Sequence, residues 1–307
     1  RCPPIPRPPQ RERIDDHTMT GLRPRFLLAY KNMNRWTTAR FDIDLSRPRV
    51  MGIVNVTPDS FSDGGRYAER CHALGHCEQL IREGADILDI GGESSRPGAP
   101  TLSVDEEWTR LEAVLHDAVT LGVPISVDTC KPEVMRRALD AGVDIVNDIR
   151  ALGAPGALEA VAAVPGTGVC LMHMRGDPAT MQVRTHYDDV VVEVSDFLRA
   201  RAQALMAAGV AHGQIVLDPG IGFGKTPEQN MRLQRQQSAI LALGWPVLVG
   251  WSRKSTLGVI TGRPVEQRLP ASLAAALAGV MSFEECIGLV LLRGQLFDTI
   301  APGGMLS

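Results

Sequence analysis

The chain has 307 residues, of which 44% are hydrophobic, so it can bury either one α/β barrel or two smaller domains. The formal net charge is −3 and lysines and arginines form no basic stripe, so we expect no nucleic-acid partner. No apolar run is long enough to cross a bilayer, and the Pro/Arg-rich N-terminus lacks the apolar segment of a signal peptide. We therefore expect a cytoplasmic protein that acts on small molecules, away from membranes.

The six cysteines are scattered without the paired spacing of a zinc ribbon or a disulfide scaffold, which suits a reducing compartment. One cluster, Cys71-His72 with His76-Cys77, has ligand types that a metal ion accepts. On a helix these four side chains spread over more than one face. The sequence therefore favours a partly exposed helix surface there over a metal site.

Basic residues are almost all arginine, 28 against only four lysines. Three of the lysines, Lys131, Lys225 and Lys254, closely follow apolar runs that look like strands. An ammonium is a compact point charge. We interpret these lysines as cations that sit against a ring or a phosphate.

Residues 1–45 have five prolines in the first nine positions and little periodicity, and we expect a largely disordered extension there. Residues 46–307 are expected to form one domain. From Val50 onward short apolar runs alternate with longer amphipathic segments, which is typical of a parallel sheet with crossover helices. The expected strands are Val50–Val56, Ile87–Ile90, Ile125–Val127, Ile145–Asn147, Val169–Met172, Ile215–Leu217 and Val247–Val249, with an eighth at Ile287–Leu292.

Helices are expected between these strands, and the repeat of strand and helix predicts a (β/α)8 TIM barrel. A doubly wound sheet is the alternative, but no Gly-x-Gly-x-x-Gly follows the first strand. The expected helices are Cys71–Glu83, Val104–Leu121, Glu133–Ala141, Ala157–Val164, Tyr187–Ala208, Pro227–Leu243 and Ala271–Met281.

Nearly every predicted strand ends in polar, chemically useful residues, and in a barrel the carboxyl ends of the strands carry the catalytic groups. A generic loop after the first strand would be shorter and plainer than the polar stretch between Asn55 and Gly65. The other strand ends lead into Asp89–Gly98, Asp128-Thr129, Asn147-Asp148, Met172-His173, Asp218-Pro-Gly and Ser252–Ser255.

Each of these residues also has a structural interpretation. Asp128 and Asn147, taken singly, are as well explained as helix caps. His173 stands between two methionines, so it is better explained as part of a packed wall than as a catalyst. The three glycines of the stretch after Asp218 either shape a turn or let the backbone approach a flat ligand; they are Gly220, Gly222 and Gly224.

Two carboxylates and an amide, Asp128, Asp218 and Asn147, offer acceptors and a donor to a guanine-like or pterin ring. Lys254 is placed to bond a ring carbonyl. Arg96 and the loop after the first strand can hold a diphosphate, with Mg²⁺ bridging through Asn55. Ser255 opens a helix whose N-terminal amides suit a carboxylate or a phosphate.

These residues closely resemble the dihydropteroate synthase family over about Val50 to Ala278. Six motifs stand in the family's order, and they are Asn55-Val-Thr-Pro-Asp-Ser-Phe-Ser-Asp-Gly-Gly65, Gly91-Gly-Glu-Ser-Ser-Arg-Pro-Gly98, Ser126-Val-Asp-Thr129, Asn147-Asp-Ile149, Leu217-Asp-Pro-Gly220 and Ser252-Arg-Lys-Ser255. The resemblance implies condensation of 6-hydroxymethyl-7,8-dihydropterin diphosphate with 4-aminobenzoate to 7,8-dihydropteroate and diphosphate. It also implies Mg²⁺, sensitivity to sulfonamides and a homodimer formed through the later helices.

By the same resemblance the pterin is held by Asp128, Asn147, Asp218 and Lys254, and Met172 lines its pocket. Asn55 touches Mg²⁺, and Arg96 contacts the diphosphate. Asp128, Lys254, Asp63 and Arg96 are the residues expected to carry the chemistry, with Asp128 stabilising a delocalised pterin cation. The aminobenzoate pocket is expected to consist of Phe61, Asp63, Ser95, Pro97, Phe223 and Ser255.

The sequence departs from the family at its C-terminus. The family has an eighth strand that ends in an Arg-x-His element and then a last helix, whereas the last histidine here is His212 and neither element is found after Met281. We therefore expect a barrel incomplete at its eighth βα unit, with uncovered apolar faces at the first and seventh strand units and unpaired sheet edges. Weak or absent synthase activity is expected despite an intact pterin pocket. Arg293 is expected to substitute in part for the missing arginine.

Two alternatives remain open at this point. A non-catalytic pterin-binding homologue or partner subunit would keep the pocket and lose the grip on diphosphate. A pterin-binding methyltransferase barrel shares the ring-holding acids, but it does not need the Ser-Ser-Arg-Pro loop at residues 94–97 or the Ser-Arg-Lys-Ser strand end at residues 252–255. The presence of both motifs argues against the methyltransferase.

Overall fold

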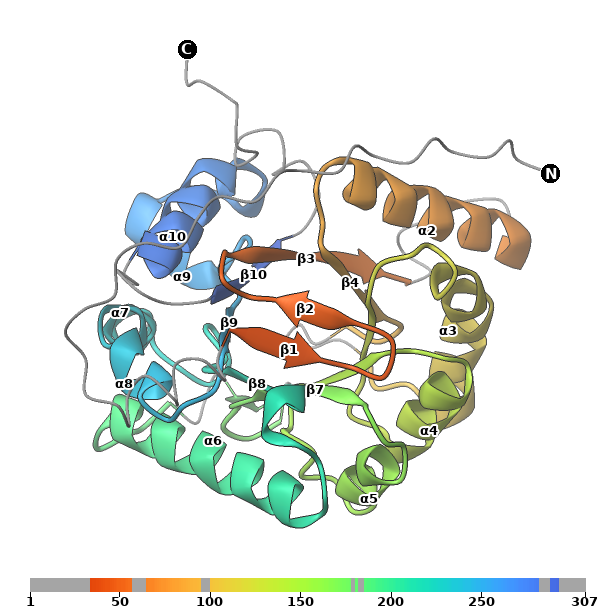
Figure 1. Ribbon diagram of the computed structural model, residues 1–307. Coiled ribbons are helices and arrows are strands. Elements are labelled where there is room, and N and C mark those ends of the chain that lie inside the picture. The colour runs from red at the N-terminus through yellow and green to blue at the C-terminus, as the bar shows by residue number, and fades with distance from the viewer. Residues whose placement is uncertain are drawn as a thin grey trace, which may run out of the picture.

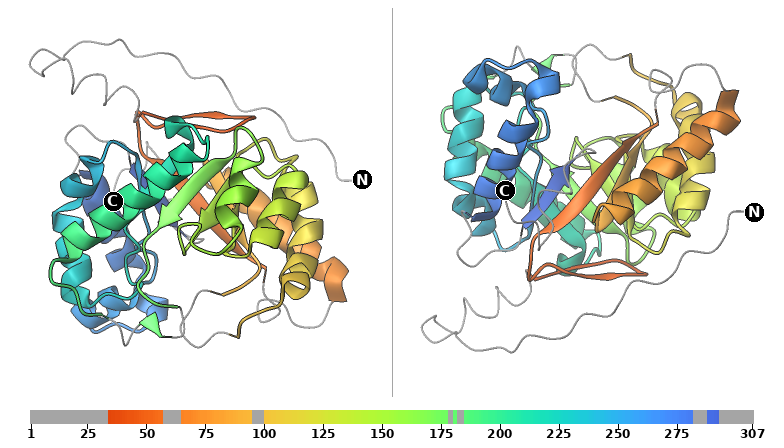
Figure 2. Two further views of the ribbon diagram at one scale, coloured as in Figure 1. Left: turned by 90° about the horizontal axis from the view of Figure 1, so that it is seen from below. Right: turned by 90° about the horizontal axis from the view of Figure 1, so that it is seen from above.

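The computed structural model describes residues 34–56, 65–94, 100–177, 180–181, 185–281 and 288–292. Eight parallel strands close into a barrel in the order β10-β3-β4-β5-β6-β7-β8-β9, and helices surround it (Figures 1 and 2). The strands are β3 (Arg49–Asn55), β4 (Ile87–Gly91), β5 (Ile125–Asp128), β6 (Ile145–Asp148), β7 (Gly168–Met172), β8 (Ile215–Asp218), β9 (Val247–Val249) and β10 (Gly288–Leu292).

The barrel strands β4 to β9 are buried on both faces, because side chains fill the barrel on one side and helices cover the other. All five residues of β4 and of β7 are buried. Parallel strands with two covered faces consist of nearly continuous apolar runs, which explains why the sequence alone located them within about one residue. The predicted (β/α)8 barrel is confirmed.

The helices follow their strands as the sequence predicts, with capping residues at several starts. A capping box formed by Ser103 and Glu106 begins α3, and Asp189 accepts from two backbone N–H groups at the start of α6. The predicted helix at Pro227–Leu243 is two helices, separated at Gln236. The helices are α2 (Gly65–Arg82), α3 (Val104–Ala118), α4 (Pro132–Asp140), α5 (Ala157–Ala162), α6 (Val190–Ala207), α7 (Pro227–Arg235), α8 (Gln237–Leu241), α9 (Ser255–Thr261) and α10 (Leu269–Met281).

The eighth strand is present and pairs on both sides. In β10, Leu289 is the register partner of Arg49 in β3 and of Leu248 in β9. The expected unpaired edges at the first and seventh strands are therefore wrong. No helix follows β10 among the residues that the structure describes, so the eighth βα unit is represented there by its strand.

An antiparallel hairpin of β1 (Arg35–Thr37) and β2 (Asp42–Asp44) precedes the barrel. Trp36 is fully buried, and its indole N–H donates to the carbonyl of Gln214, 2.8 Å away, just before β8. Arg40 donates to both carboxylate oxygens of Asp144, just before β6, at 2.7 and 2.6 Å. The prediction of an extension over residues 1–45 is thus wrong for the described residues 34–45, which belong to the fold.

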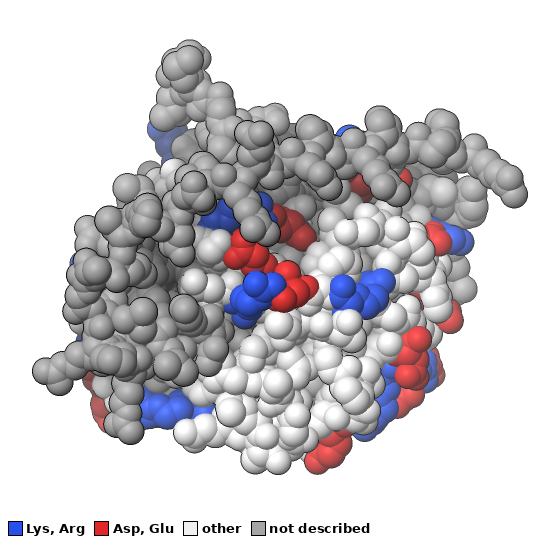
Figure 3. Space-filling model, in the orientation of Figure 1, with Lys and Arg blue, Asp and Glu red and all other residues white. Residues whose placement is uncertain are grey.

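Because the hairpin contacts the chain just before β6 and β8, it covers the amino-terminal end of the barrel (Figure 1). Its outer face carries charges of both signs, including the ion pair of Arg35 with Asp42, and the described surface in this view shows no extended basic area (Figure 3). The carboxyl ends of the strands lie at the opposite end of the barrel. Those ends carry most of the predicted site residues.

Candidate active site

Sheet register places three predicted site residues at one level of the barrel. Asn55 at the end of β3 is the partner of Gly91, Gly91 is the partner of Asp128, and Asp128 is the partner of Asn147. Since neighbouring parallel strands are about 4.8 Å apart, these side chains start close together. Gly91 also keeps the space open, because a Cβ there would lie 3.3 Å from the Cβ of Asp128.

Asn147 is oriented by a buried carboxyl group one level deeper in the barrel. The Asn147 side-chain amide donates to Oδ2 of Asp89 at 3.0 Å, and Asp89 is only 2% exposed. Burial raises the pKa of Asp89 to about 6, and the neighbouring Ser126 hydroxyl and then the Asn147 amide oppose that shift. The second oxygen of Asp89 has no hydrogen-bond partner in the described structure. Asp89 therefore fixes the amide of Asn147 and leaves acceptor capacity inside the barrel.

Asp128 stands among other acids. Burial, and then the negative charges of Asp89 and Asp148, raise its pKa well above the ordinary value. Asp148 is not expected to bind a ligand, because its two carboxylate oxygens already accept the backbone N–H groups of Arg150 and Leu152, both at 2.8 Å. A carboxyl group in such surroundings is stabilised as an anion by a ligand that brings N–H donors or positive charge.

The opposite wall of the site comes from β8, β9 and the loops after them. Asp218 accepts the backbone N–H of Gly220 at 2.6 Å, and burial raises its pKa to about 6. The ammonium of Lys254 lies 4.2 Å from the ring centre of Phe223, within cation–π distance. Burial lowers the pKa of Lys254 to about 8, with Asp218 and Asp128 opposing that shift. Met172, the register partner of Asp218, is buried beside it.

A strained backbone position directs Lys254 into the site. Arg253 has a φ of 54°, which is unusual for a residue with a Cβ. Its N–H donates to the hydroxyl of Ser272 at 2.9 Å, and this fully buried serine donates in turn to the carbonyl of Arg268 at 2.8 Å. Helix α10 thereby holds the strand end that carries Lys254, while Ser255 is exposed at the start of α9.

The other two lysines do not have the role that the sequence suggested. Lys131 forms ion pairs with Glu93 and Glu107, and Lys225 donates to three backbone carbonyls. In the described residues neither lies against an aromatic ring. The interpretation of all three lysines as ring or phosphate cations is therefore wrong for Lys131 and Lys225, whereas Lys254 lies beside Phe223.

The structural interpretation of His173 is confirmed. Its ring packs at 5.0 Å, edge to face, against Phe197 and at 6.1 Å from Tyr187, and burial lowers its pKa to about 2. Among the described residues no group of three or more histidines, cysteines or acids is arranged to hold a metal ion. Cys71 and Cys77 lie in α2, one exposed and one buried. The metal interpretation of the cluster at residues 71–77 is therefore not supported.

Five predicted site residues, Phe61, Asp63, Ser95, Arg96 and Pro97, lie outside the described residues. Asn230 was not among the predicted site residues, yet its side chain accepts the N–H of Gly222 at 2.9 Å and donates to Thr256 at 2.9 Å. It thereby links the loop after β8 to α9. In the sequence, the only indication of this role is that Asn230 is a polar residue on the buried face of α7.

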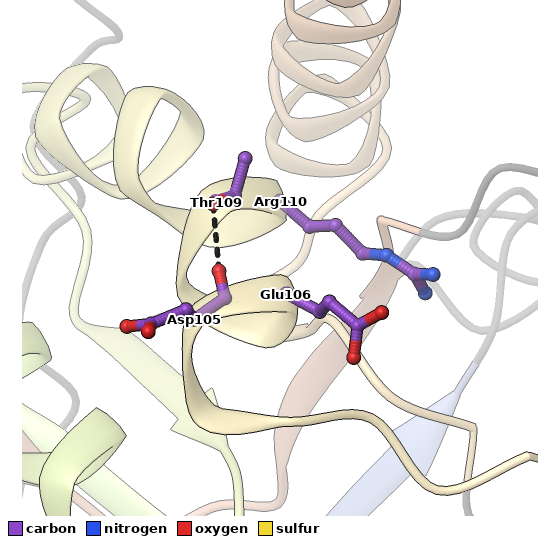
Figure 4. Close-up of a pocket in the computed structure, with 4 residues that line it drawn as sticks. All are labelled: Asp105, Glu106, Thr109 and Arg110. Carbon is purple, nitrogen blue, oxygen red and sulfur yellow. Dashed lines mark hydrogen bonds between the residues drawn. The ribbon is translucent and has the colours of Figure 1, made fainter.

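One further surface feature is a shallow depression on α3 of about 360 Å³, lined by Asp105, Glu106, Thr109 and Arg110 (Figure 4). Thr109 donates to the backbone carbonyl of Asp105 at 2.6 Å, as in an ordinary helix. No predicted site residue lines it. We assign it no function.

Buried acids and one lysine at the carboxyl end of a (β/α)8 barrel define a class of enzyme that binds a nitrogen-rich ring. Consistent with this class, the model of the family described as pterin binding enzyme matches residues 51–283. No helix in the described part of the chain is both long and apolar enough to span a membrane.

Known relatives are similar over most of their length. Dihydropteroate synthase of Neisseria meningitidis serogroup B is 51% identical over 251 residues, covering 80% of this chain and 88% of that protein. A solved structure of dihydropteroate synthase from Xanthomonas albilineans with 4-aminobenzoic acid has a TM-score of 0.78 at 46% identity, covering 86% and 94% of the two chains. A Yersinia pestis dihydropteroate synthase complexed with a sulfonamide drug has a TM-score of 0.79 at 41% identity, covering 87% and 95%. The chain belongs to the dihydropteroate synthase family of pterin binding enzymes.

Proposed function

We propose that the chain condenses 6-hydroxymethyl-7,8-dihydropterin diphosphate with 4-aminobenzoate to give 7,8-dihydropteroate and diphosphate. The observation that carries this proposal is the convergence of Asp128, Asn147, Asp218 and Lys254 at one end of the barrel. Their acceptors and single cation complement the N–H groups and the carbonyl of a pterin ring.

Asp218 and Lys254 are proposed to bind the pterin ring, and Asp128 is proposed to stabilise the charge that develops on it. Asp218 is fixed by the N–H of Gly220 and accepts ring N–H donors, while Lys254 donates to the ring carbonyl and covers Phe223. When the C–O bond to diphosphate breaks, positive charge spreads over the pterin. Asp128 then stabilises that charge, because a carboxylate that is poorly compensated in the free protein interacts strongly with a cation in a dry site.

The neutral amine of the second substrate then attacks the carbon that diphosphate has left and loses a proton to diphosphate or water, so no covalent bond to the protein is needed. Phe223 and Ser255 flank Lys254 and are proposed to line the aminobenzoate pocket together with Phe61, Asp63, Ser95 and Pro97. By family likeness, Arg96 would contact the diphosphate. Sulfonamides resemble 4-aminobenzoate, and we propose that they compete for this pocket.

Mg²⁺ is part of this proposal. Asn55 offers a hard amide oxygen at the end of β3, half-buried at the level of Asp128, and Mg²⁺ commonly takes one or two protein ligands together with substrate phosphates. A donor set this small fits a metal ion that arrives with diphosphate. When bound, the ion would neutralise charge on the leaving diphosphate.

We also propose that the chain forms a homodimer through its later helices. Four large apolar side chains on α9, α10 and the turn between them are exposed, and they are Val259 (69%), Ile260 (55%), Val265 (40%) and Leu277 (44%). Apolar side chains grouped in this way are common at subunit interfaces. Light scattering on the purified protein tests the assembly, and the cytoplasmic location stays a prediction.

Two titrations with Mg²⁺ present test the proposed function. The first measures binding of the pterin diphosphate by calorimetry, and the second measures diphosphate release when 4-aminobenzoate is added. Binding with release supports the synthase. Binding without release favours the non-catalytic pterin-binding homologue. No binding contradicts both.

A further inference from the structure

Lys225 is a buried cation that the proposed reaction does not use. It lies in the loop between β8 and α7 (residues 219–226) and is 3% exposed. Its ammonium nitrogen is 2.9 Å from the carbonyl oxygens of Gly220 and Phe223 and 3.2 Å from that of His173. Among the described residues it forms no ion pair with a carboxylate. A buried lysine with only backbone partners is rare and requires an explanation.

The three carbonyls match the ammonium form of the side chain. An ammonium has three N–H donors, whereas a neutral amine has only two, so the charged form alone satisfies every acceptor. Burial lowers the pKa of Lys225 to about 7, and the negative charge of Asp218 opposes that shift. The surrounding carbonyls therefore form a site for a positive charge close to Asp218.

Two of the three carbonyls belong to residues that form the wall of the pterin site. Gly220 donates its N–H to Asp218, and the ring of Phe223 lies below the ammonium of Lys254. The loop reaches this shape only with glycine at alternate positions. Gly220 has a φ of 66°, and a Cβ there would overlap the carbonyl oxygen of His173. Lys225 thus binds the backbone that carries the wall.

We propose that Lys225 is a positioning residue that holds this loop in its binding shape and adds to the positive charge of Lys254 that keeps Asp218 a carboxylate. The inference rests on the proposed function, since it assumes that Asp218 and Lys254 hold the pterin. Asp218 is faced by the charges of Lys225, Lys254 and Asp89, and Lys225 by those of Asp218, Lys254 and Arg175. Lys225 touches neither substrate in this arrangement.

The test compares two variants of the same loop. Lys225→Met keeps the length of the side chain and removes its charge and its donors. Tyr187→Phe is the matched control, because it removes one hydrogen bond to the loop, from the tyrosine hydroxyl to the carbonyl of Gly224 at 3.1 Å, without changing the charge. For each protein, calorimetry gives the Kd for 6-hydroxymethyl-7,8-dihydropterin diphosphate with Mg²⁺ between pH 5 and pH 8.

We expect Lys225→Met to weaken binding at pH 7 about tenfold or more. The acid limb of the profile, where Kd rises as pH falls, should move upward by about one pH unit, because Asp218 loses a favourable neighbouring charge. Tyr187→Phe is expected to stay within about threefold, with the acid limb in place. A role as a loop brace alone would raise Kd without moving the limb, so an unmoved limb overturns the charge part of the proposal.

An unchanged Kd overturns the whole of it. Should Lys225→Met fail to fold by circular dichroism, Lys225→Gln keeps two donors without the charge and is read by the same acid limb. The wild-type profile is a test that needs no variant, because absence of any acid limb between pH 5 and pH 7 contradicts the titration of Asp218 on which the inference depends. Failure of the wild-type chain to bind pterin diphosphate refutes the proposed function instead.

Discussion

The two walls of the candidate site are built in different ways. On the β4–β6 side Asp128 and Asn147 stand on strands, and sheet register together with Asp89 fixes where they point. On the β8–β9 side Lys254 and Phe223 stand on loops, which need internal contacts to keep their shape. Strands alone can therefore place the acids, whereas the cationic wall depends on residues that do not touch the proposed substrate.

The largest effect is expected for Asp218, the acid at the end of β8 on the β8–β9 wall. Asp218→Asn removes the carboxylate that accepts ring N–H groups while keeping the shape of the side chain, and pterin affinity should fall about 100-fold, as expected for loss of a buried charge-assisted hydrogen bond. Calorimetry measures it, and Asp177→Asn, at an exposed acid, is the control. Equal affinity of Asp218→Asn and wild type would contradict the assigned wall.

Substitutions of Lys131 and Lys254 should affect different properties, the free energy of unfolding for Lys131 and pterin affinity for Lys254. Lys131→Met leaves Glu93 and the buried Glu107 without their cation and should cost about 3 kcal/mol of unfolding free energy, with pterin affinity little changed. Lys254→Met should do the reverse, with an affinity loss of about 30-fold and a nearly unchanged Tm. Urea unfolding and calorimetry on both variants measure the contrast. Loss of stability in both variants, or loss of pterin affinity in both, would contradict the different roles assigned to the two lysines.

The pH dependence of pterin binding should have two limbs that report the two kinds of charge. As pH falls through about 6, Asp218 becomes protonated and ceases to accept from the ring. As pH rises through about 7 and then about 8, Lys225 and then Lys254 lose their protons and their charges. Affinity should therefore be greatest between about pH 6 and pH 7, and it should fall by about tenfold per unit below pH 6 and above pH 8. A flat profile between pH 5 and pH 9 would refute both assignments.

The smallest effect is expected for the hydrogen bond between Arg253 and Ser272, which holds the strand end that carries Lys254. Ser272→Ala removes the hydroxyl that accepts the N–H of Arg253 and leaves that strained backbone with one partner fewer. The unfolding free energy should fall by about 1 kcal/mol and pterin affinity by about threefold. Ser238→Ala, a serine in the short helix α8, is the matched control. A larger effect of the control would show that Ser272 does not support Lys254.

The barrel and the strand-borne wall were predictable from local sequence. The strands are short apolar runs with polar ends. Parallel pairing brings those ends together irrespective of the exact bounds of the helices. Asn55, Asp128 and Asn147 are at one level for that reason alone. The departure at the C-terminus misled the prediction about sheet edges, because pairing of β10 depends on backbone groups rather than on the missing motif.

The loop-borne features were not predictable, because their partners are far away in the sequence. Trp36 bonds a carbonyl 178 residues later, and Lys225 bonds the carbonyl of His173, 52 residues earlier. A lysine near a strand end looks the same in sequence whether it meets a ring, two glutamates or three carbonyls. Only the tertiary arrangement separates Lys254, Lys131 and Lys225.

The most direct test of the account is a crystal structure of the protein with 6-hydroxymethyl-7,8-dihydropterin diphosphate and Mg²⁺. We predict that the ring lies between Asp128 and Asp218, with Lys254 at its carbonyl and Lys225 still bound to its three backbone carbonyls. A ring bound elsewhere, or direct contact between Lys225 and the ligand, would contradict the division of the site into a strand-built and a loop-built wall.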